Sequence, residues 1–581
     1  MPGAGGGGGL QTNMLRINSM NVLRFLVLLI IVIVGVKMYS MLKTKQLDTP
    51  AKDSFWNKHG GVMANDREME INQKMEPVAV QYVQQEKDKP KEVEKPKPRQ
   101  LKDFGTSGMR IVHLDLKGAA PKLSYLQQLF PLLASIGVNG ILMEYEDTFP
   151  YHDGLEILKS TYAFSSADID EIQQLADSNN LEIIPLIQTF GHMEFALKHD
   201  KYRHLREVER YPNSLNPHLP GSLNLVKEML SQVLDKHSKS ACLHIGADEV
   251  FHLGESAESK QWINEQRGDI GKMFLDHIKE VGSFVVNKYP GLKLLMWDDM
   301  MRKISKERIR KSGVIEYIAP MVWFYHPDFN VDQVEAFLAK YMESGFRSIW
   351  FASAFKGATG VSQGWTPIKY HLENQLRWLQ VIKSTSKFPS LHFQGLALTG
   401  WQRYDHFSTL CELLPVAIPS LVVCMQAVTH GSFTNEAKAN SQQVLGFKNI
   451  DLENNVSEGD GTFAGAEIYQ MVHWIYQNLK SEVTRVLESN SEIKGWFNHY
   501  NRKHQFANPR NMEHFGSDVL RVHKQWEEYL GNFRVQMEKI YFPDTVEEWM
   551  EENVNLYMDP LREFVKDYKE IIALMAAPKQ K

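Results

Sequence analysis

Eight short apolar runs, separated by longer amphipathic segments, occupy the middle of this chain. The runs cover residues 109–114, 140–144, 182–186, 241–245, 293–297, 320–323, 348–352 and 395–399. Segments with helical periodicity between them include residues 123–136, 167–177, 222–236, 261–288, 331–344 and 372–383. Strand-like runs that alternate with helices are typical of an α/β fold with a parallel sheet. This alternation within residues 106–430 predicts a (β/α)₈ barrel of the TIM type, although the same periodicity also allows an open, doubly wound sheet.

Polar and aromatic residues gather directly after these runs. They include His113, Asp115 and Lys117; Glu144 to Asp147; Gln188 and His192; Asp248 and Glu249; Trp297 to Asp299; Trp323 and Tyr325; Ser353 and Lys356; and Trp401, Arg403 and Asp405. In a barrel the carboxyl ends of all strands form one rim, and active sites are built on that rim. The sequence therefore predicts one site to which most of the loops contribute.

Two adjacent carboxylates, Asp248 and Glu249, follow the run at 241–245. Neighbouring side chains point to opposite faces within a strand, but both can face one cavity where the chain curls into a loop. Two carboxylates held that close do not both ionise freely, so the pKa of one is raised and that group can act as an acid near neutral pH. An isolated Asp-Glu pair is more often a solvated loop or a helix cap, because so short a motif is weak.

The wider pattern around this pair is more specific. His-x-Gly-x-Asp-Glu (244–249) resembles the catalytic signature of the β-N-acetylhexosaminidases of glycoside hydrolase family 20. Stretches similar to those of the D-type branch of that family occur in the same order, namely HLDLKGAAPK (113–122), EYEDTFPY (144–151), QTFGHMEF (188–195), ASAFKGATG (352–360) and LTGWQRYDH (398–406). The resemblance covers residues 108–430 and implies a (β/α)₈ barrel.

This resemblance implies a retaining exo-enzyme that removes terminal β-linked GalNAc or GlcNAc from glycoconjugates. Catalysis in the family is substrate-assisted, because the 2-acetamido oxygen attacks the anomeric carbon and forms an oxazolinium intermediate. The resemblance implies that Glu249 is the general acid and base and that Asp248 orients the acetamido group. It implies no metal and no cofactor.

The same resemblance suggests how the sugar is held. Trp297, Trp323 and Trp401 are expected to wall the pocket, and Tyr325 to donate its hydroxyl to the attacking oxygen. His192 is expected either to contact a sugar hydroxyl or to support Asp248.

Two motifs depart from the broader family. Asp115-Leu116-Lys117 stands where a sugar-binding arginine is usual, and Gln188-Thr189-Phe190 stands where Asp-x-Pro is usual. We therefore expect Asp115, Lys117 and Glu144 to bind the O3 and O4 hydroxyls. A ring that is not clamped tightly at O4 could accept both GlcNAc and GalNAc.

The amino-terminal part is predicted to differ from the barrel. Residues 1–20 form a Gly-rich disordered tail, and residues 21–42 contain the apolar run FLVLLIIVIVGV between Arg24 and Lys37. We interpret residues 21–42 as a transmembrane signal-anchor whose flanking charges reach the interfaces, with a cleaved signal peptide as the other interpretation. Residues 43–105 are polar, contain EKDKPKEVEKPKPR, and are predicted to be a disordered stem.

The charges around residues 21–42 do not decide on which side of the membrane the catalytic part lies. Arg16 and Arg24 precede the span and several lysines follow it within residues 37–52, which favours a catalytic part that faces the cytoplasm. Anchored glycosidases usually face the lumen of the secretory pathway, as in the Golgi, and the sequon at Asn455 is compatible with that location. A cytoplasmic or nucleocytoplasmic catalytic domain is the alternative.

Composition argues against two classes of protein, those that bind nucleic acid and those that are built on disulfides. A formal net charge of −5 argues against a nucleic-acid-binding protein, and only three cysteines, Cys242, Cys411 and Cys424, do not make a disulfide framework. Residues 431–581 are predicted to be a helical region that packs on the barrel or on a second subunit, as in a homodimer. The rival functions are a membrane-anchored glycan-binding pseudoenzyme and a metal-dependent barrel hydrolase that would use His113, His192 and His244 with Asp115 and Asp248.

Overall fold

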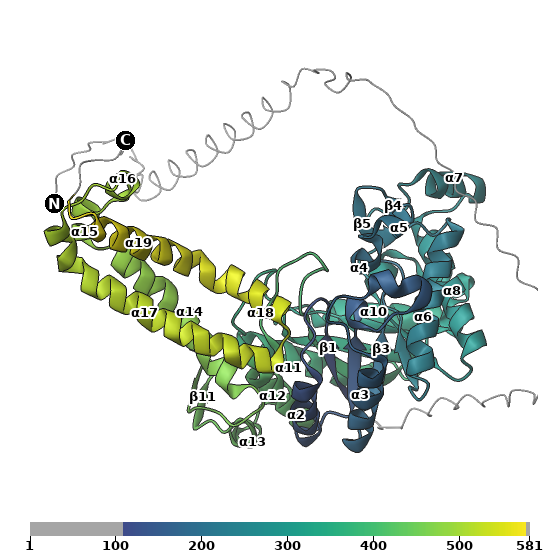
Figure 1. Ribbon diagram of the computed structural model, residues 1–581. Coiled ribbons are helices and arrows are strands. Elements are labelled where there is room, and N and C mark those ends of the chain that lie inside the picture. Colours follow the sequence, from purple (N-terminus) through teal and green to yellow (C-terminus); the bar gives the residue numbers. More distant parts are fainter. Residues whose placement is uncertain (1–107, 577–581) are drawn as a thin grey trace, which may run out of the picture. The chain divides into compact units, whose positions relative to one another are not determined.

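The computed structural model describes residues 108–576, and its central feature is a closed barrel of eight parallel strands in the order β1-β10-β9-β8-β7-β6-β3-β2. The barrel strands are β1 (Met109–Asp115), β2 (Gly140–Glu144), β3 (Glu182–Leu186), β6 (Cys242–His244), β7 (Lys293–Trp297), β8 (Ile318–Trp323), β9 (Ser348–Lys356) and β10 (His392–Gly400). Each strand pairs with its neighbours in parallel, and β1 closes the barrel against β10. Figure 1 shows β1 and β3 among the helices that surround the barrel. The predicted barrel is confirmed.

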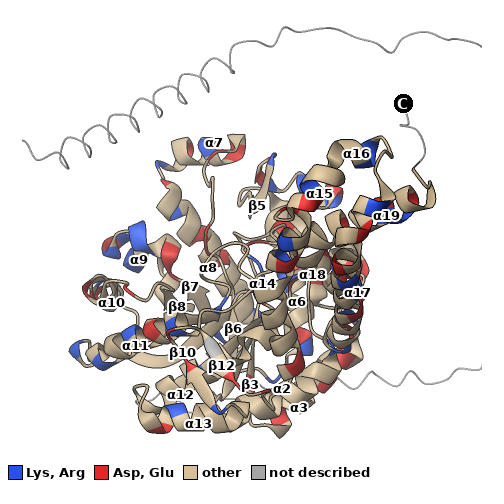
Figure 2. Cartoon of the chain, turned by 90° about the vertical axis from the view of Figure 1, so that its left-hand side faces the viewer, with Lys and Arg blue, Asp and Glu red and all other residues tan. Residues whose placement is uncertain are grey.

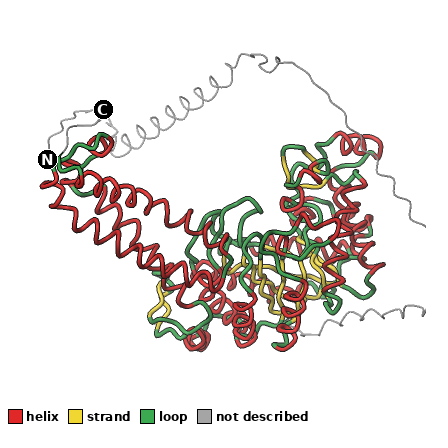
Figure 3. The backbone as a smooth tube through the Cα atoms, viewed as in Figure 1, coloured by secondary structure: helices red, strands yellow, loops and turns green. Residues whose placement is uncertain are grey.

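Helices cover the outside of the strands, as Figure 3 shows. The α-helices up to residue 445 are α2 (Leu123–Ser135), α3 (Ser166–Ser178), α4 (Glu194–Leu197), α5 (Asp200–Arg203), α6 (Pro220–Lys236), α7 (Ala257–Gln266), α8 (Ile270–Lys288), α9 (Lys306–Ser312), α10 (Val331–Ser344), α11 (Ile368–Ser384), α12 (Leu414–His430) and α13 (Asn435–Leu445). Side-chain caps fix several of their starts, as in α3, where Ser165 and Asp168 form a reciprocal capping box.

The inside of the barrel is packed with side chains and is not an open channel. Strand residues that include Ile111, Leu142, Cys242, Leu295 and Trp350 form one buried apolar cluster. Filled interiors of this kind are typical of eight-stranded barrels, so a ligand can bind only at the rim.

One predicted helix is two helices in the structure. The segment 261–288 is divided between α7 and α8, because Arg267 adopts a left-handed backbone with φ 45° and ends α7. Asp269 then caps α8 by accepting a hydrogen bond from the backbone N–H of Lys272 at 2.9 Å. The short hairpins β4 (Arg206–Val208) with β5 (Tyr211–Leu215) and β11 (Asn449–Asp451) with β12 (Val456–Glu458) were also not expected.

The carboxyl-terminal region is helical, as predicted, and packs on the barrel. Its helices are α14 (Ala466–Leu487), α15 (Ser491–Trp496), α16 (His499–Lys503), α17 (Pro509–Ile540), α18 (Pro543–Met550) and α19 (Leu556–Ala573). The backbone N–H of Lys122, which precedes α2, donates to the carbonyl of Ile540 at 2.6 Å. The hydroxyl of Tyr541 accepts from the backbone N–H of Leu414 at 3.1 Å, so the region is attached at the starts of both α2 and α12.

Figure 2 shows basic and acidic residues interspersed along the helices, for example in α9, α11 and α17. Several form ion pairs between exposed groups, such as Lys387 with Glu335 at 2.8 Å and Arg485 with Asp518 at 2.8 Å. Exposed pairs of this kind contribute little stability individually, typically ~0–1 kcal/mol each.

The predictions of a tail at 1–20, a membrane span at 21–42 and a stem at 43–105 lie outside the described residues. Within residues 108–576, no helix has both the length and the apolar character needed to cross a membrane. The sequon residue Asn455 has a structural role in this part of the chain. Its Oδ1 accepts from the backbone N–H of Ile368 at 2.9 Å, and its Nδ2 donates to the carbonyl of Thr366 at 2.8 Å, so Asn455 supports the start of α11.

Candidate active site

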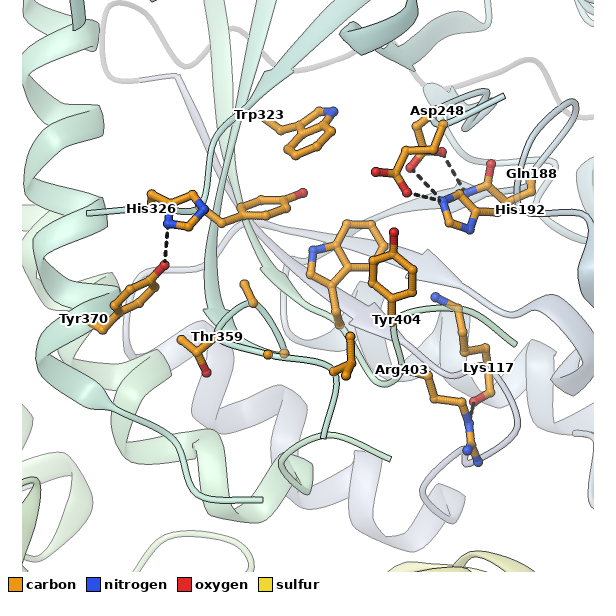
Figure 4. A pocket seen from close by; sticks show the side chains of 17 residues that line it. Lys117, Gln188, His192, Asp248, Trp323, His326, Thr359, Tyr370, Arg403 and Tyr404 are labelled. Carbon is orange, nitrogen blue, oxygen red and sulfur yellow. Dashed lines mark hydrogen bonds and ion pairs between the residues drawn. The ribbon is translucent and has the colours of Figure 1, made fainter. Parts of the chain in front are cut away.

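A cavity of about 620 Å³ opens at the carboxyl ends of the barrel strands, where the sequence predicted a site. It is lined by Lys117, Gln188, His192, Asp248, Glu249, Trp323, Tyr325, His326, Gly357, Ala358, Thr359, Gly360, Val361, Tyr370, Trp401, Arg403 and Tyr404. Figure 4 shows these side chains from close by. The volume lies within the range of roughly 300–1,000 Å³ typical of small-molecule sites.

The two adjacent carboxylates, Asp248 and Glu249, both line this cavity. The strand β6 ends at His244, and the backbone then turns left-handed at Gly246 (φ 61°), Ala247 (φ 66°) and Glu249 (φ 44°). This coiling removes the alternation of a strand and brings both side chains to one side. Positive φ is uncommon for residues other than glycine and is often found at functional sites.

A glycine after β3 lets a second loop approach the carboxylate loop. A Cβ atom on Gly191 would lie only 2.1 Å from the backbone oxygen of Asp248, so no larger residue fits there without displacing one of the loops. His192 follows this glycine and is thereby placed beside both carboxylates.

His192 connects the two carboxylates. Its Nε2 lies 3.2 Å from Oε2 of Glu249 and 3.6 Å from Oδ2 of Asp248. Burial alone would lower the pKa of His192, but the carboxylate of Asp248 and the hydrogen bond to Glu249 outweigh burial and raise its pKa to about 10. His192 is therefore a cation at neutral pH, and its contacts agree with the expected support of Asp248.

Gln188, which also lines the cavity, holds Asp248 in place. Its Nε2 donates to Oδ1 of Asp248 at 3.2 Å and to Oε1 of Glu144 at 3.5 Å. Its Oε1 accepts from the backbone N–H of Ala247 at 3.1 Å. One neutral amide thus fixes both the carboxylate of Asp248 and the strained backbone that carries it.

The raised pKa that the sequence predicted for one member of the pair falls on Asp248. Burial raises its pKa, the cation of His192 lowers it, and the carboxylates of Glu144 and Glu249 raise it further. Asp299 lies behind the pair and accepts from the backbone N–H of Glu249 at 3.0 Å. Burial and the nearby Asp248 raise the pKa of Asp299 to about 7.

Three of the expected aromatic residues form one wall of the cavity. The rings of Trp323 and Tyr325 stack with centroids 5.1 Å apart, and the Trp401 ring meets Tyr325 edge-on at 6.2 Å. Asp299 fixes the indole of Trp323 by accepting from its Nε1 at 3.4 Å. Burial raises the pKa of Tyr325 well above its usual value, so its hydroxyl stays protonated and can donate a hydrogen bond.

Trp297 is a correction to the predicted wall, because it does not line the cavity. It is fully buried, and its ring lies behind the site against His244, with centroids 4.3 Å apart, and against Trp401, at 5.8 Å. As the last residue of β7 its side chain points into the barrel interior and joins the apolar cluster there. Trp297 therefore supports Trp401 from behind.

Among the three residues expected to bind sugar hydroxyls, only Lys117 lines the cavity. Its Nζ pairs with Oδ2 of Asp115 at 2.8 Å and lies 5.2 Å from the centroid of the Trp401 ring. Burial lowers the pKa of Lys117, but the carboxylates of Asp115 and Glu144 outweigh it and raise the pKa. Lys117 is therefore a buried cation.

Asp115 and Glu144 are corrections, because both are buried beneath the cavity. Asp115 also accepts from the backbone N–H of Gln402 at 2.8 Å, and Glu144 bonds to Nε2 of His113 at 3.0 Å. Their carboxylates are occupied by neighbours at the strand ends, as buried charges must be. Their effect on a ligand is therefore indirect, through Lys117, Gln188 and Asp248.

Several lining residues were not singled out from the sequence. Tyr404 stands inside the LTGWQRYDH stretch, is 51% exposed, and has its pKa raised by burial and by the carboxylate of Glu249. The stretch itself could have indicated Tyr404. His326 and Tyr370, by contrast, come from the loop after β8 and from helix α11, and no sequence pattern connects them.

Residues 108–576 contain no group of three or more His, Cys, Asp or Glu side chains with the geometry of a metal site. The candidate metal ligands His113 and His244 have other contacts. His113 bonds to Glu144, and Nδ1 of His244 accepts from the backbone N–H of Gly246 at 3.0 Å.

Comparison with known proteins gives consistent matches. Residues 130–325 match the family model for the glycosyl hydrolase family 20 catalytic domain. The chain is 43% identical over 465 residues to hexosaminidase D of Homo sapiens, covering 80% of this chain and 95% of that protein. It is 50% identical over 343 residues to hexosaminidase D of Bos taurus, covering 59% of this chain and 98% of that protein. A solved β-N-acetylhexosaminidase from Bacteroides fragilis aligns with a TM-score of 0.44 and 14% identity over 58% of this chain and 70% of that one.

Proposed function

Because this chain belongs to glycosyl hydrolase family 20 and is a β-N-acetylhexosaminidase, we propose that it removes terminal β-linked GalNAc or GlcNAc residues with retention of configuration. The observation that carries this proposal is the placement of Asp248 and Glu249 on one cavity with Trp323, Tyr325 and Trp401. A carboxylate pair beside an aromatic wall suits a sugar whose 2-acetamido group takes part in the reaction.

In the first step the carbonyl oxygen of the acetamido group attacks the anomeric carbon. Glu249 donates its proton to the glycosidic oxygen, the bond between that oxygen and the anomeric carbon breaks, and an oxazolinium ion forms. In the second step Glu249 removes a proton from water, which attacks the anomeric carbon and reopens the ring. Each step inverts the anomeric carbon, so the two steps together restore the original β configuration.

Asp248 acts on the acetamido group in this scheme. Its carboxylate accepts the N–H hydrogen bond and balances the positive charge that develops in the oxazolinium ion. The cation of His192, 3.6 Å away, favours the ionised form of Asp248, which burial disfavours. Tyr325 donates its protonated hydroxyl to the carbonyl oxygen and so directs that oxygen to the anomeric carbon.

Lys117 is the group that we propose for binding the sugar hydroxyls. It is a buried cation on the cavity wall, and it is held by Asp115 against the Trp401 ring. Because Asp115 itself is buried beneath the cavity, Lys117 offers a donor with no carboxylate beside it on the wall, which places little constraint on the orientation of the O4 hydroxyl. We therefore propose that both GlcNAc and GalNAc are accepted.

The test is hydrolysis of p-nitrophenyl β-GlcNAc and β-GalNAc by the wild type, Glu249→Gln and Asp248→Asn. Loss of general acid–base catalysis should lower kcat by ~100-fold or more for Glu249→Gln, while Glu280→Gln on the exposed face of α8 serves as the control. A folded wild type that binds these sugars without cleaving them would mean a glycan-binding protein. A chelator that abolished the activity would favour a metal-dependent hydrolase.

We further propose that residues 21–42 anchor the chain in a membrane of the secretory pathway, with the catalytic part in the lumen. The apolar run between Arg24 and Lys37 supports this proposal. Protease treatment of intact microsomes should leave the barrel undigested, and carbonate washing should not extract it. Digestion of the barrel in sealed vesicles would instead place it on the cytoplasmic side.

A further inference from the structure

One end of the cavity is not used by the reaction scheme. It is lined by His326, Tyr370 and Thr359 together with the loop 357–361. Figure 4 shows His326, Tyr370 and Thr359 on the opposite side of the cavity from Asp248, Gln188 and His192, with Trp323 between the two groups. We call this end the acyl lobe.

The walls of the acyl lobe are small and fixed in place. Gly357 and Ala358 have no side chain beyond Cβ, and a Cβ on Gly357 would lie 2.0 Å from the backbone oxygen of Trp401. The loop is held from behind, because the backbone N–H of Gly357 donates to Oε2 of Glu412 at 2.9 Å and Nζ of Lys356 donates to the Trp401 carbonyl at 2.5 Å. The space is therefore part of the fold and does not depend on one flexible side chain.

The acyl lobe also contains polar groups for which the reaction has no use. The hydroxyl of Tyr370 and Nδ1 of His326 lie 3.1 Å apart and form a hydrogen bond. The hydroxyl of Thr359 is buried and has no hydrogen-bond partner among the described residues. A buried hydroxyl normally has a partner, and rotation of the Thr359 side chain about χ1 would let its hydroxyl bond to a ligand group that enters the lobe.

The reaction geometry determines which part of the substrate points into the lobe. The glycosidic oxygen must lie at Glu249, near Tyr404, so the leaving group departs at that end. In the proposed reaction the acetamido nitrogen is at Asp248 and the carbonyl oxygen is at Tyr325, whose neighbour His326 lines the lobe. The methyl carbon of the acetamido group then points away from Asp248, towards the lobe.

We propose that the acyl lobe accepts hexosaminides whose nitrogen at C2 carries an acyl group larger than acetyl, such as N-propanoyl or N-glycolyl. This inference rests on the proposed function. The added methylene of an N-propanoyl group would pack against Ala358, and the added hydroxyl of an N-glycolyl group would bond to Thr359. The chemistry of the two steps is unchanged, because the carbonyl oxygen remains the nucleophile.

The test is a series of p-nitrophenyl β-glucosaminides with N-acetyl, N-glycolyl, N-propanoyl and N-butanoyl groups. An extra methylene that a pocket cannot accommodate typically lowers kcat/KM by roughly 10–200-fold. We expect the N-glycolyl and N-propanoyl substrates to remain within about tenfold of N-acetyl. Cleavage of N-acetyl with a loss of more than ~100-fold for both longer groups would overturn the acyl lobe and leave the proposed function intact. No cleavage of N-acetyl would refute the proposed function itself.

Two variants locate the effect in the lobe. Ala358→Leu should lower the ratio of kcat/KM for N-propanoyl to that for N-acetyl by about tenfold or more, whereas Ala358→Ser should leave this ratio unchanged. Thr359→Val should lower the N-glycolyl rate relative to N-propanoyl. The last measurement is the activity of each variant on a disaccharide substrate with an N-acetyl group. If Ala358→Leu impaired only that substrate, the lobe would belong to the leaving group and the proposal would be wrong.

Discussion

The carboxylate of Glu548, in the carboxyl-terminal helix α18, binds the guanidinium of Arg403 on the cavity rim through two contacts. Nη1 lies 2.5 Å from Oε1 and Nη2 lies 2.6 Å from Oε2. Oε1 of Glu548 also accepts from the backbone N–H of Leu410 at 3.2 Å. The segment 401–410, which carries Trp401 and Tyr404, is therefore fastened by a helix outside the barrel.

Loss of this fastening should impair substrate binding. Glu548→Gln removes a charge-assisted, two-point contact worth about 1.5–3 kcal/mol per hydrogen bond. We expect a lower melting temperature and a several-fold higher KM, because Tyr404 and Trp401 lose their fixed positions. Glu547→Gln is the matched control, since Glu547 is exposed on the same helix. Equal melting temperatures and equal KM values for the two variants would contradict this role of Glu548.

A charge placed at Gln188 should shift the pH dependence of activity. Gln188→Glu puts a third carboxylate beside Asp248 and Glu144, which raises the pKa of Asp248 and reduces its ionised fraction at a given pH. The acid limb of the kcat/KM profile should therefore move to higher pH. Gln188→Leu removes the hydrogen bonds without adding charge, so it should lower the rate and move the limb less than Gln188→Glu does. Superimposable limbs for wild type and Gln188→Glu would contradict this prediction.

Asp299 should make stability depend on pH. Its pKa is about 7 in the native state, whereas an aspartate in the unfolded chain titrates near ~3.9. Between these values the native state holds the extra proton, so the free energy of unfolding falls as pH rises through this window. Asp299→Asn lacks this titration. Its melting temperature relative to wild type should therefore rise from about pH 5 to about pH 8. Asp328→Asn, on an exposed loop, is the control, and we expect its difference in melting temperature from wild type to be independent of pH.

The contact between Gly191 and Asp248 should not tolerate a side chain. Gly191→Ala places a methyl group 2.1 Å from the Asp248 backbone oxygen and must displace the loop that carries the carboxylates. A shift of about 1 Å in such a group can cost ~100-fold in rate, so we expect a large loss of kcat. Gly154→Ala is the control, because a Cβ there meets nothing within 4 Å. Full activity of Gly191→Ala would show that the two loops can separate freely.

Much of the barrel could be predicted because its strands are buried on both faces. The runs at β2, β3 and β7 were predicted with the bounds that the structure shows, since each is a continuous apolar run in a parallel sheet. Helix ends were less accurate. Helix α11 begins at Ile368, earlier than the predicted 372, because Asn455, far along the chain, accepts a hydrogen bond from the backbone N–H of Ile368.

In the candidate site, the sequence identified residues that belong to a local motif but not residues whose position depends on how the chain packs. Asp248 and Glu249 were recognisable because their motif is local, and the structure places both on the cavity. Trp297 was misassigned because residue type does not reveal whether a side chain at a strand end points to the rim or into the barrel. Tyr370 was missed because its place on the cavity depends on how α11 packs, which no short motif encodes.

The attachment of both Lys122 and Arg403 to the region 538–548 has a consequence for how the protein is made. Synthesis is directional, and the ribosome releases the last barrel strand well before Glu548. At ~5–20 residues per second this interval is on the order of ten seconds. During that time the nascent barrel has all of its strands, but its rim lacks the contacts that fix segment 401–410. The site therefore matures only near the end of translation, and a ribosome that stalls within α14 would hold a barrel with an unfinished site.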